Sequence, residues 1–193
     1  AMKKGMLAAL LCLILLSGCG GKPEPIPLEE LPQDYSLEQA KADGCLVTED
    51  GTVTSGQEAW EEFLNAAEAG KAASVRLCSY YTLDDPSRYD PDYYESVKDD
   101  YPMMFLKDLS YDGERFTTLS YEEGQRHEET YSFLRRREQT APSFGVKIIQ
   151  YIITNDAESS LEKIGSQLYS SSFSPEDWIP FDIVYQEIIP PEA

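Results

Sequence analysis

The residue types that most often carry out catalysis are scarce in this chain. His127 is the only histidine among the 193 residues, which excludes metal sites built from several histidines and makes a Ser-His-Asp triad hard to assemble. Ser160 and Lys163 match a Ser-x-x-Lys motif, but the Ser-Asp-Asn and Lys-Thr-Gly motifs that accompany it in acyl enzymes are missing from the sequence. No glycine-rich phosphate loop is present. We therefore expect a protein that is not an enzyme and that holds no cofactor.

Residues 84–101 form an acidic stretch that also carries tyrosines, and it is the first segment that could bind a ligand. Its seven carboxylates offer oxygen ligands for calcium, but their spacing fits no EF-hand loop, so calcium is the weaker alternative and we predict no metal site. Tyrosine combines apolar area with a polar tip, which suits a surface for a glycan or a protein. The simpler interpretation, which we favour, is that Tyr93, Tyr94 and Tyr101 cap a sheet edge. The candidate ligand surface in this stretch consists of Tyr89, Asp90, Asp92, Tyr93 and Tyr94.

A run of three arginines, residues 135–137, is the one basic cluster in an acidic chain. On a β-strand Arg135 and Arg137 share a face, and Arg136 takes the other. Two arginines on one face could hold a carboxylate or a phosphate through paired hydrogen bonds, so we include Arg135 and Arg137 in the candidate ligand surface. The simpler interpretation is that these arginines pair with the many acids of the protein.

Residues 1–18 have the pattern of a lipoprotein signal peptide. Lys3 and Lys4 precede an apolar run from Met6 to Leu16, which is too short to cross a bilayer but has the length of a secretory h-region. The run ends in Leu-Ser-Gly before Cys19, and this resembles the lipobox of bacterial lipoproteins. In those proteins the cysteine thiol is acylated and the chain is cut before it. The pattern predicts lipidation at Cys19 and a lipid anchor in the cell membrane, with the protein on the extracytoplasmic side.

The segment after the lipobox, residues 19–33, reads as a tether. Two glycines are followed by closely spaced prolines, which favour an extended chain and cannot donate hydrogen bonds to a sheet. Residues 34–193 are long enough for one domain with a substantial core. After removal of Lys3 and Lys4 the chain would have 14 basic and 35 acidic residues, a net charge of −21. This charge excludes nucleic acid as a partner, because phosphate binding needs a basic surface.

Two cysteines, Cys45 and Cys78, remain in the predicted domain, and they could form a disulfide. Disulfides persist outside the cytoplasm, and both cysteines fall near predicted strands. The alternative is that each is a separately buried thiol.

Hydrophobic spacing predicts two helices at the start of the domain. Ser36 and Gln39 have the spacing of a capping box for a short helix. From Ser55 to Gly70, apolar residues such as Trp60 and Phe63 recur on one face, which predicts a longer amphipathic helix.

Most of the rest of the domain reads as β-strands. Asp50-Gly51 and Asp112-Gly113 predict tight hairpins. A further helix is predicted over residues 157–171, beginning near Asn155 or Asp156. The other predicted strands are residues 73–83, 129–140, 144–154 and 181–189. We therefore predict an α+β fold, mainly an antiparallel β-sheet with two to three helices packed on it, in a single domain.

Four short segments of the domain carry a family resemblance. They read DYSLEQAKADGCLV, AWEEFLNAAEAGK, VRLCSYYTL and LSYDGERFTTLSYEE, within residues 34–125. Together they resemble an uncharacterised lipoprotein family of Gram-positive bacteria, catalogued as domain of unknown function 4362. The resemblance implies an extracytoplasmic α+β domain without a known activity, so it carries over no catalytic residue. The chain departs from the family pattern in residues 84–101, which look like an insertion, and in Cys45, where a polar residue is expected.

Three functions remain open from the sequence. The first is a non-enzymatic domain that binds an envelope or extracellular protein through its sheet and the acidic stretch. The second is a receptor for a small ligand or a glycan, which requires a concave pocket. The third is an envelope hydrolase, which requires two carboxylates in a cleft.

Overall fold

The structure, a computed structural model, describes residues 25–141, 145–167 and 174–189. The predicted signal peptide and Cys19 lie outside the described residues, so the lipid anchor stays a prediction. Within the part of the chain that is described, no helix is both long and apolar enough to cross a membrane.

Sheet A is six-stranded and has the order β2-β1-β3-β4-β5-β6. Its neighbouring strands are antiparallel, except that β1 and β3 are parallel. The strands are β1 (Leu46–Glu49), β2 (Thr52–Ser55), β3 (Ala73–Tyr81), β4 (Met103–Tyr111), β5 (Phe116–Glu122) and β6 (Gln125–Tyr131).

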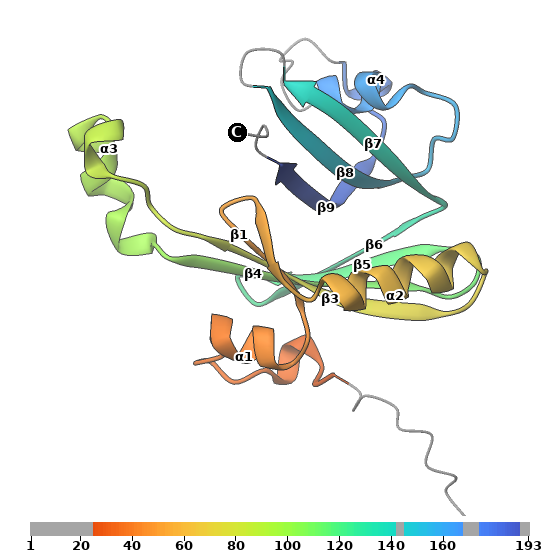
Figure 1. Ribbon diagram of the computed structural model, residues 1–193, viewed down its shortest axis with the longest axis horizontal. Helices are drawn as coiled ribbons and strands as arrows, with labels where there is room; N and C mark the ends of the chain where they lie inside the picture. The colour runs from red at the N-terminus through yellow and green to blue at the C-terminus, as the bar shows by residue number, and fades with distance from the viewer. Residues whose placement is uncertain (1–24, 142–144, 168–173, 190–193) are drawn as a thin grey trace, which may run out of the picture.

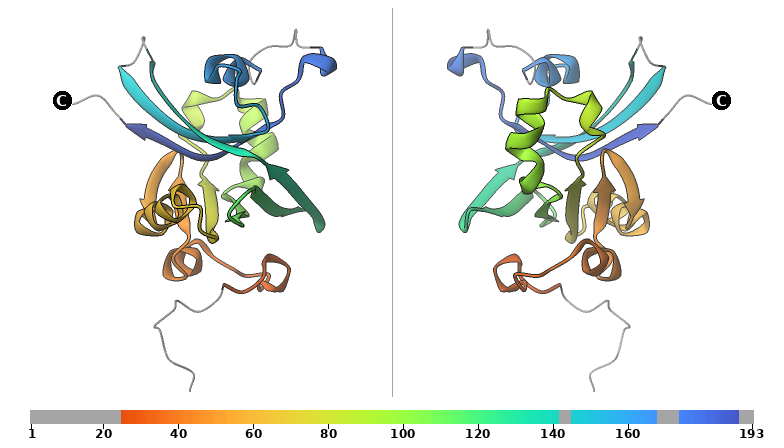
Figure 2. Two further views of the ribbon diagram at one scale, coloured as in Figure 1. Left: turned by 90° about the vertical axis from the view of Figure 1, so that its right-hand side faces the viewer. Right: turned by 90° about the vertical axis from the view of Figure 1, so that its left-hand side faces the viewer.

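Sheet B is three-stranded and antiparallel, and it lies over one face of sheet A (Figures 1 and 2). It consists of β7 (Phe133–Ala141), β8 (Val146–Thr154) and β9 (Phe181–Ile189). Only Ser132 separates β6 from β7, so the chain passes from one sheet to the other within a single residue. The prediction of one strand over residues 129–140 is therefore wrong, because this segment belongs to two strands in different sheets.

Three of the four helices in the described residues pack on faces of the two sheets, and the fourth lies apart from them (Figure 1). They are α1 (Leu37–Ala42), α2 (Gln57–Glu68), α3 (Pro91–Val97) and α4 (Leu161–Ser166), with 3-10 turns η1 (Leu28–Glu30), η2 (Pro86–Arg88), η3 (Lys98–Asp100) and η4 (Pro175–Asp177). α1 covers one face of sheet A, α2 packs on the other face beneath sheet B, and α4 packs on the outer face of sheet B (Figures 1 and 2). α3 lies in the segment between β3 and β4, residues 83–101, which extends beyond both sheets (Figure 1) and which we call the arm.

The ends of these helices follow from local hydrogen bonds. The predicted capping box at α1 is confirmed, since the backbone N–H groups of Ser36 and Gln39 each donate to the other residue's side chain. α4 begins later than predicted, because the Asp156 carboxylate accepts hydrogen bonds from the backbone of Glu158 and Ser159 and holds a turn before Ser160.

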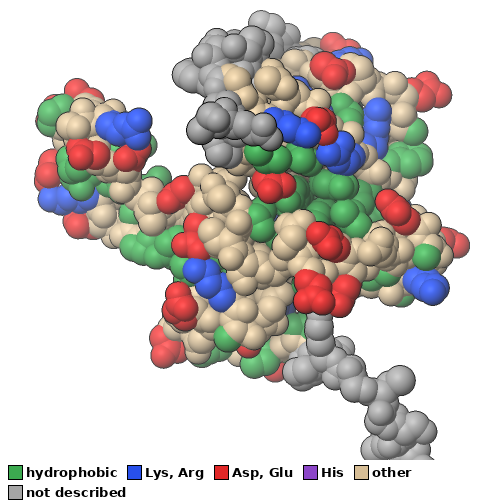
Figure 3. All heavy atoms as spheres, in the orientation of Figure 1, with side chains coloured by type: hydrophobic (Ala, Val, Ile, Leu, Met, Phe, Trp, Pro, Cys, Tyr) green, Lys and Arg blue, Asp and Glu red, His purple; other side chains and the backbone are tan. Residues whose placement is uncertain are grey.

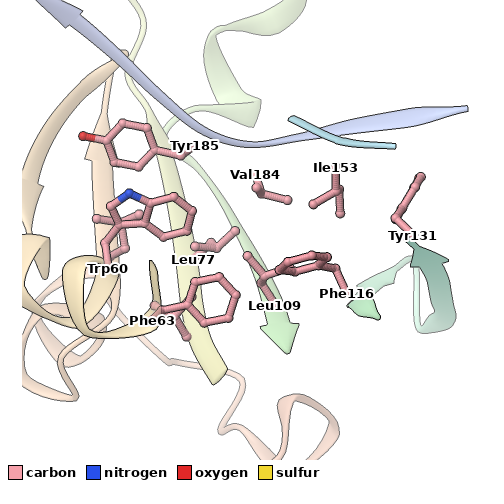
Figure 4. Packing of buried hydrophobic residues seen from close by; sticks show 11 residues of the cluster. Trp60, Phe63, Leu77, Leu109, Phe116, Tyr131, Ile153, Val184 and Tyr185 are labelled. Atoms are coloured by element: carbon pink, nitrogen blue, oxygen red, sulfur yellow. The ribbon is translucent and has the colours of Figure 1, made fainter. Parts of the chain in front are cut away.

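The main core lies where α2 meets the two sheets (Figure 4). Trp60 of α2 is 1% exposed and stacks on Tyr185 of sheet B, with ring centroids 5.0 Å apart. Phe63, one turn further along α2, meets Phe116 of sheet A edge to face at 6.5 Å. The fold class is as predicted: an α+β body, mainly antiparallel sheet, held in one unit.

Candidate functional site

A cavity of about 780 Å³ lies where β4 and β5 separate. The register of this pair runs from Tyr111↔Phe116 to Lys107↔Ser120 and ends there, although both strands continue. Among the described residues, positions 103–106 of β4 pair with β3 alone, and positions 121–122 of β5 pair with β6 alone. We call the wedge between these diverging strand ends the β4–β5 notch.

The notch has two differently built sides, because successive side chains of a strand point to opposite faces. On the side of sheet B the lining includes Ser79, Tyr81, Phe105, Ser120, Ile183 and Gln186. On the other side, beneath η1 and the segment that leads to α1, it includes Leu28, Leu31, Tyr35, Met104, Leu106 and Tyr121. Apolar walls with a few hydroxyl and amide groups are typical of pockets that bind organic ligands.

An aromatic pair stands beside the notch on the side of sheet B. Tyr81 and Phe105 meet edge to face with ring centroids 6.0 Å apart, and they are 42% and 52% exposed. Neighbouring exposed aromatic side chains beside a cavity indicate a contact surface, since solitary exposed apolar residues are common but grouped ones are not.

In the described part of the chain, the notch is lined by two charged side chains, and the positive one, Lys107, is paired with an acid. Lys107 lines the cavity, and its ammonium group is bonded to the Asp182 carboxylate of β9, which ties sheet A to sheet B. Glu122 is the one carboxylate among the described residues of the lining, and it is exposed. The site therefore favours a neutral or a cationic ligand over an anion.

Cys45 and Cys78 are free thiols, 2% and 1% exposed, within one small core beneath α1. The register partner of Cys78 is Val47, so Cys45 is its diagonal neighbour. Cys45 precedes β1, so it is not the residue opposite Cys78 in the parallel pair of β1 and β3. Of the two alternatives left open by the sequence, the structure therefore has the two separately buried thiols and no disulfide between Cys45 and Cys78.

These thiols are expected to be inert in the folded protein. Burial raises the pKa of Cys45, and burial raises the pKa of Cys78 to about 12, so neither forms a reactive thiolate near neutral pH. In a chain with Cys12→Ser and Cys19→Ser, we expect a thiol reagent such as DTNB to label neither cysteine at pH 8 until urea unfolds the protein. Rapid labelling of the folded protein would contradict this prediction.

The predicted ligand residues of the acidic stretch lie on the arm and form a small aromatic cluster there. Tyr89 contacts Tyr93 and Tyr94, each with ring centroids 6.0 Å apart. Asp90 caps α3 by accepting hydrogen bonds from the backbone of Asp92 and Tyr93. The preferred interpretation, that Tyr93, Tyr94 and Tyr101 cap the sheet edge, is wrong for Tyr93 and Tyr94, because both belong to α3, which lies beyond both sheets (Figure 1).

The predicted arginine pair does share a face of β7, but both side chains are engaged internally. Arg135 donates to the backbone carbonyls of Asp156 and Ser159, at 3.2 and 2.6 Å. Arg137 donates to the side chain of Gln139 and lies against Gly165 of α4. These arginines therefore hold the loop before α4 and α4 itself, and they are on different elements from the tyrosines of the arm.

A second hollow, of about 460 Å³, lies between α2 and β7, where hydrophobic side chains gather on the surface in Figure 3. Leu64, Leu134 and Tyr151 line it. Arg136 also lines it, but its guanidinium is paired with the Glu138 carboxylate at 2.7 Å.

The structure shows where the residues considered for catalysis, Ser160, Lys163 and His127, lie. Ser160 caps α4, since its side-chain oxygen accepts a hydrogen bond from the backbone N–H of Lys163. His127 is exposed on the edge strand β6. Within residues 25–141, 145–167 and 174–189, no three histidine, cysteine, aspartate or glutamate side chains are grouped so that they could hold a metal ion.

Sequence reasoning missed the β4–β5 notch. The signal in the sequence was the run of four apolar residues at the start of β4, Met103–Leu106, because a strand with one face in solvent alternates apolar and polar residues. No protein-family model, curated protein sequence or solved structure matches the chain. The resemblance to the uncharacterised lipoprotein family therefore stays a prediction.

Proposed function

We propose that this chain is a lipid-anchored protein on the extracytoplasmic side of the cell membrane, and that its folded domain is a non-enzymatic receptor. Its ligand occupies the β4–β5 notch. The observation that carries the proposal is the notch itself: a cavity of about 780 Å³ lined by apolar and mostly uncharged polar side chains, with an exposed aromatic pair. Such a lining binds organic groups by burial and orients them with single hydrogen bonds.

A binding role agrees better with this lining than hydrolysis does. Glycoside hydrolysis needs two carboxylates about 5–10 Å apart across the substrate. Among the described residues that line the notch, Glu122 is the one carboxylate, and the ammonium group of Lys107 is bound to Asp182.

Thermal melting of the full chain in mild detergent tests the proposal. The panel contains neutral glycans, cell-wall fragments, peptides and small amphiphiles. A ligand at one hundred times its Kd is expected to stabilise the folded state by about 2.7 kcal/mol, which raises the Tm measurably.

Two variants assign such a shift to the notch. Ser120→Phe places a ring in the cavity and is expected to abolish the shift. Ser110→Phe makes the same change at an exposed position of β4 that does not line the cavity, and it is expected to keep the shift. A panel without any stabilising compound, or a shift that survives Ser120→Phe, would contradict the proposed function.

A further inference from the structure

We propose that the ligand of the β4–β5 notch is an extended peptide segment, which binds by adding a strand to the free edge of β4. This inference rests on the proposed function and names its ligand class. Met103–Leu106 are held by β3 on one side, while the edge toward β5 is open in the described structure. An open strand edge presents rows of backbone N–H and C=O groups, which are the groups that a second extended chain pairs with.

The length of the open edge sets the length of the ligand. Residues 103–106 offer four positions, and a strand rises about 3.3 Å per residue, so the paired part of the peptide spans about 13 Å. A peptide with four to six ordered residues fits this edge. Proline is excluded at the positions whose N–H groups donate to β4.

The two sides of the notch set the side-chain pattern of the peptide. Successive side chains of a bound strand point to opposite faces of sheet A. One face offers Tyr81, Phe105 and Ile183, and the other offers Leu31, Met104 and Leu106. Apolar side chains are available on both faces, although Ser79, Ser120 and Gln186 also lie on the side of sheet B. We therefore expect the peptide to carry apolar side chains at consecutive positions. This differs from an ordinary surface strand, in which apolar and polar residues alternate.

The negative charge of the protein favours peptides in which basic residues flank the consecutive apolar residues. The chain carries a net charge of −19, the exposed carboxylate beside the notch belongs to Glu122, and Lys107 is compensated by Asp182. Flanking lysine or arginine residues are attracted to such a surface, and flanking acids are repelled.

The inference is tested with a random seven-residue peptide library displayed on phage, panned against the immobilised full chain in mild detergent. We expect enriched sequences with two or three consecutive apolar residues flanked by lysine or arginine. As synthetic peptides they should bind the wild type and Ser110→Phe with similar Kd values, and Ser120→Phe at least tenfold more weakly.

Backbone methylation then separates strand addition from other modes of binding. N-methyl groups are added either to the odd-numbered or to the even-numbered residues of an enriched peptide. One of the two methylated peptides should bind at least tenfold more weakly and the other nearly as well as before, because only every second N–H faces β4.

Equal binding of the two methylated peptides would overturn strand addition, as would the absence of enriched peptides or binding that is indifferent to Ser120→Phe. If a glycan or an amphiphile shifts the Tm through the notch while no peptide binds, the proposed function stands and this inference fails. If no ligand of any class acts through the notch, both fail.

Discussion

Replacing Gly56 with alanine is expected to lower the free energy of unfolding by about 4 kcal/mol, since a left-handed backbone costs about 1–2 kcal/mol in alanine and overpacking adds about 1–3 kcal/mol. Gly56 is the N-cap of α2 and has φ +76°. A Cβ atom there would lie 2.0 Å from the carbonyl oxygen of Cys45. That carbonyl cannot easily move, because the N–H group of Cys45 donates to Ala40 at 3.0 Å and β1 starts at the next residue.

Gly70→Ala is the matched control for this substitution. Gly70 also has a left-handed backbone, with φ +65°, but no atom lies within 4 Å of its added Cβ. Only the backbone cost of about 1–2 kcal/mol is therefore expected. Urea unfolding followed by circular dichroism measures both variants. Equal losses of stability would show that the close approach to Cys45 has no energetic effect.

Trp60→Ala is expected to destabilise the fold by about 4 kcal/mol, as complete truncation of a buried aromatic residue does. The indole contacts Phe63 of its own helix and both Tyr151 and Tyr185 of sheet B, with centroid distances of 5.6, 5.2 and 5.0 Å. Removing it leaves a void between α2 and sheet B. We expect the urea midpoint to fall and the slope of the transition to stay the same.

The other tryptophan of the chain provides the comparison. Trp178 is 47% exposed, and its ring lies 5.9 Å from that of Phe181 at the surface. Trp178→Ala is expected to cost less than about 1 kcal/mol, because much of the ring is already in water. A loss for Trp178→Ala as large as that for Trp60→Ala would contradict the assignment of the core to α2.

Elements determined by neighbouring residues could be predicted from the sequence. The Asp50-Gly51 turn is one, since both residues adopt the positive φ values of a tight hairpin, +48° and +84°. The amphipathic pattern of α2 is another, and it also identified the buried Trp60 and Phe63. The exact start of α2 was not predictable, because Ser55 has a suitable side chain but is used by β2, and Gly56 becomes the N-cap.

Elements determined by distant residues could not be predicted. The passage from β6 to β7 depends on Asn155, whose side-chain oxygen accepts hydrogen bonds from the backbone and hydroxyl of Ser132. The notch depends on where β5 leaves β4. Met103–Leu106 are apolar at four consecutive positions, but this pattern does not show which neighbouring strand pairs with them. The candidate site therefore escaped sequence reasoning, although the residues beside it are conspicuous in the fold.

The arm leaves and re-enters sheet A at adjacent points, since Tyr81 and Met103 are register partners. A short turn is enough to join antiparallel strands. Residues 83–101 can therefore be exchanged for such a turn, or for a foreign sequence, while the ladder of β3 and β4 stays intact. This position is a natural site for grafting a fluorescent reporter or an affinity epitope close to the notch without interrupting the core.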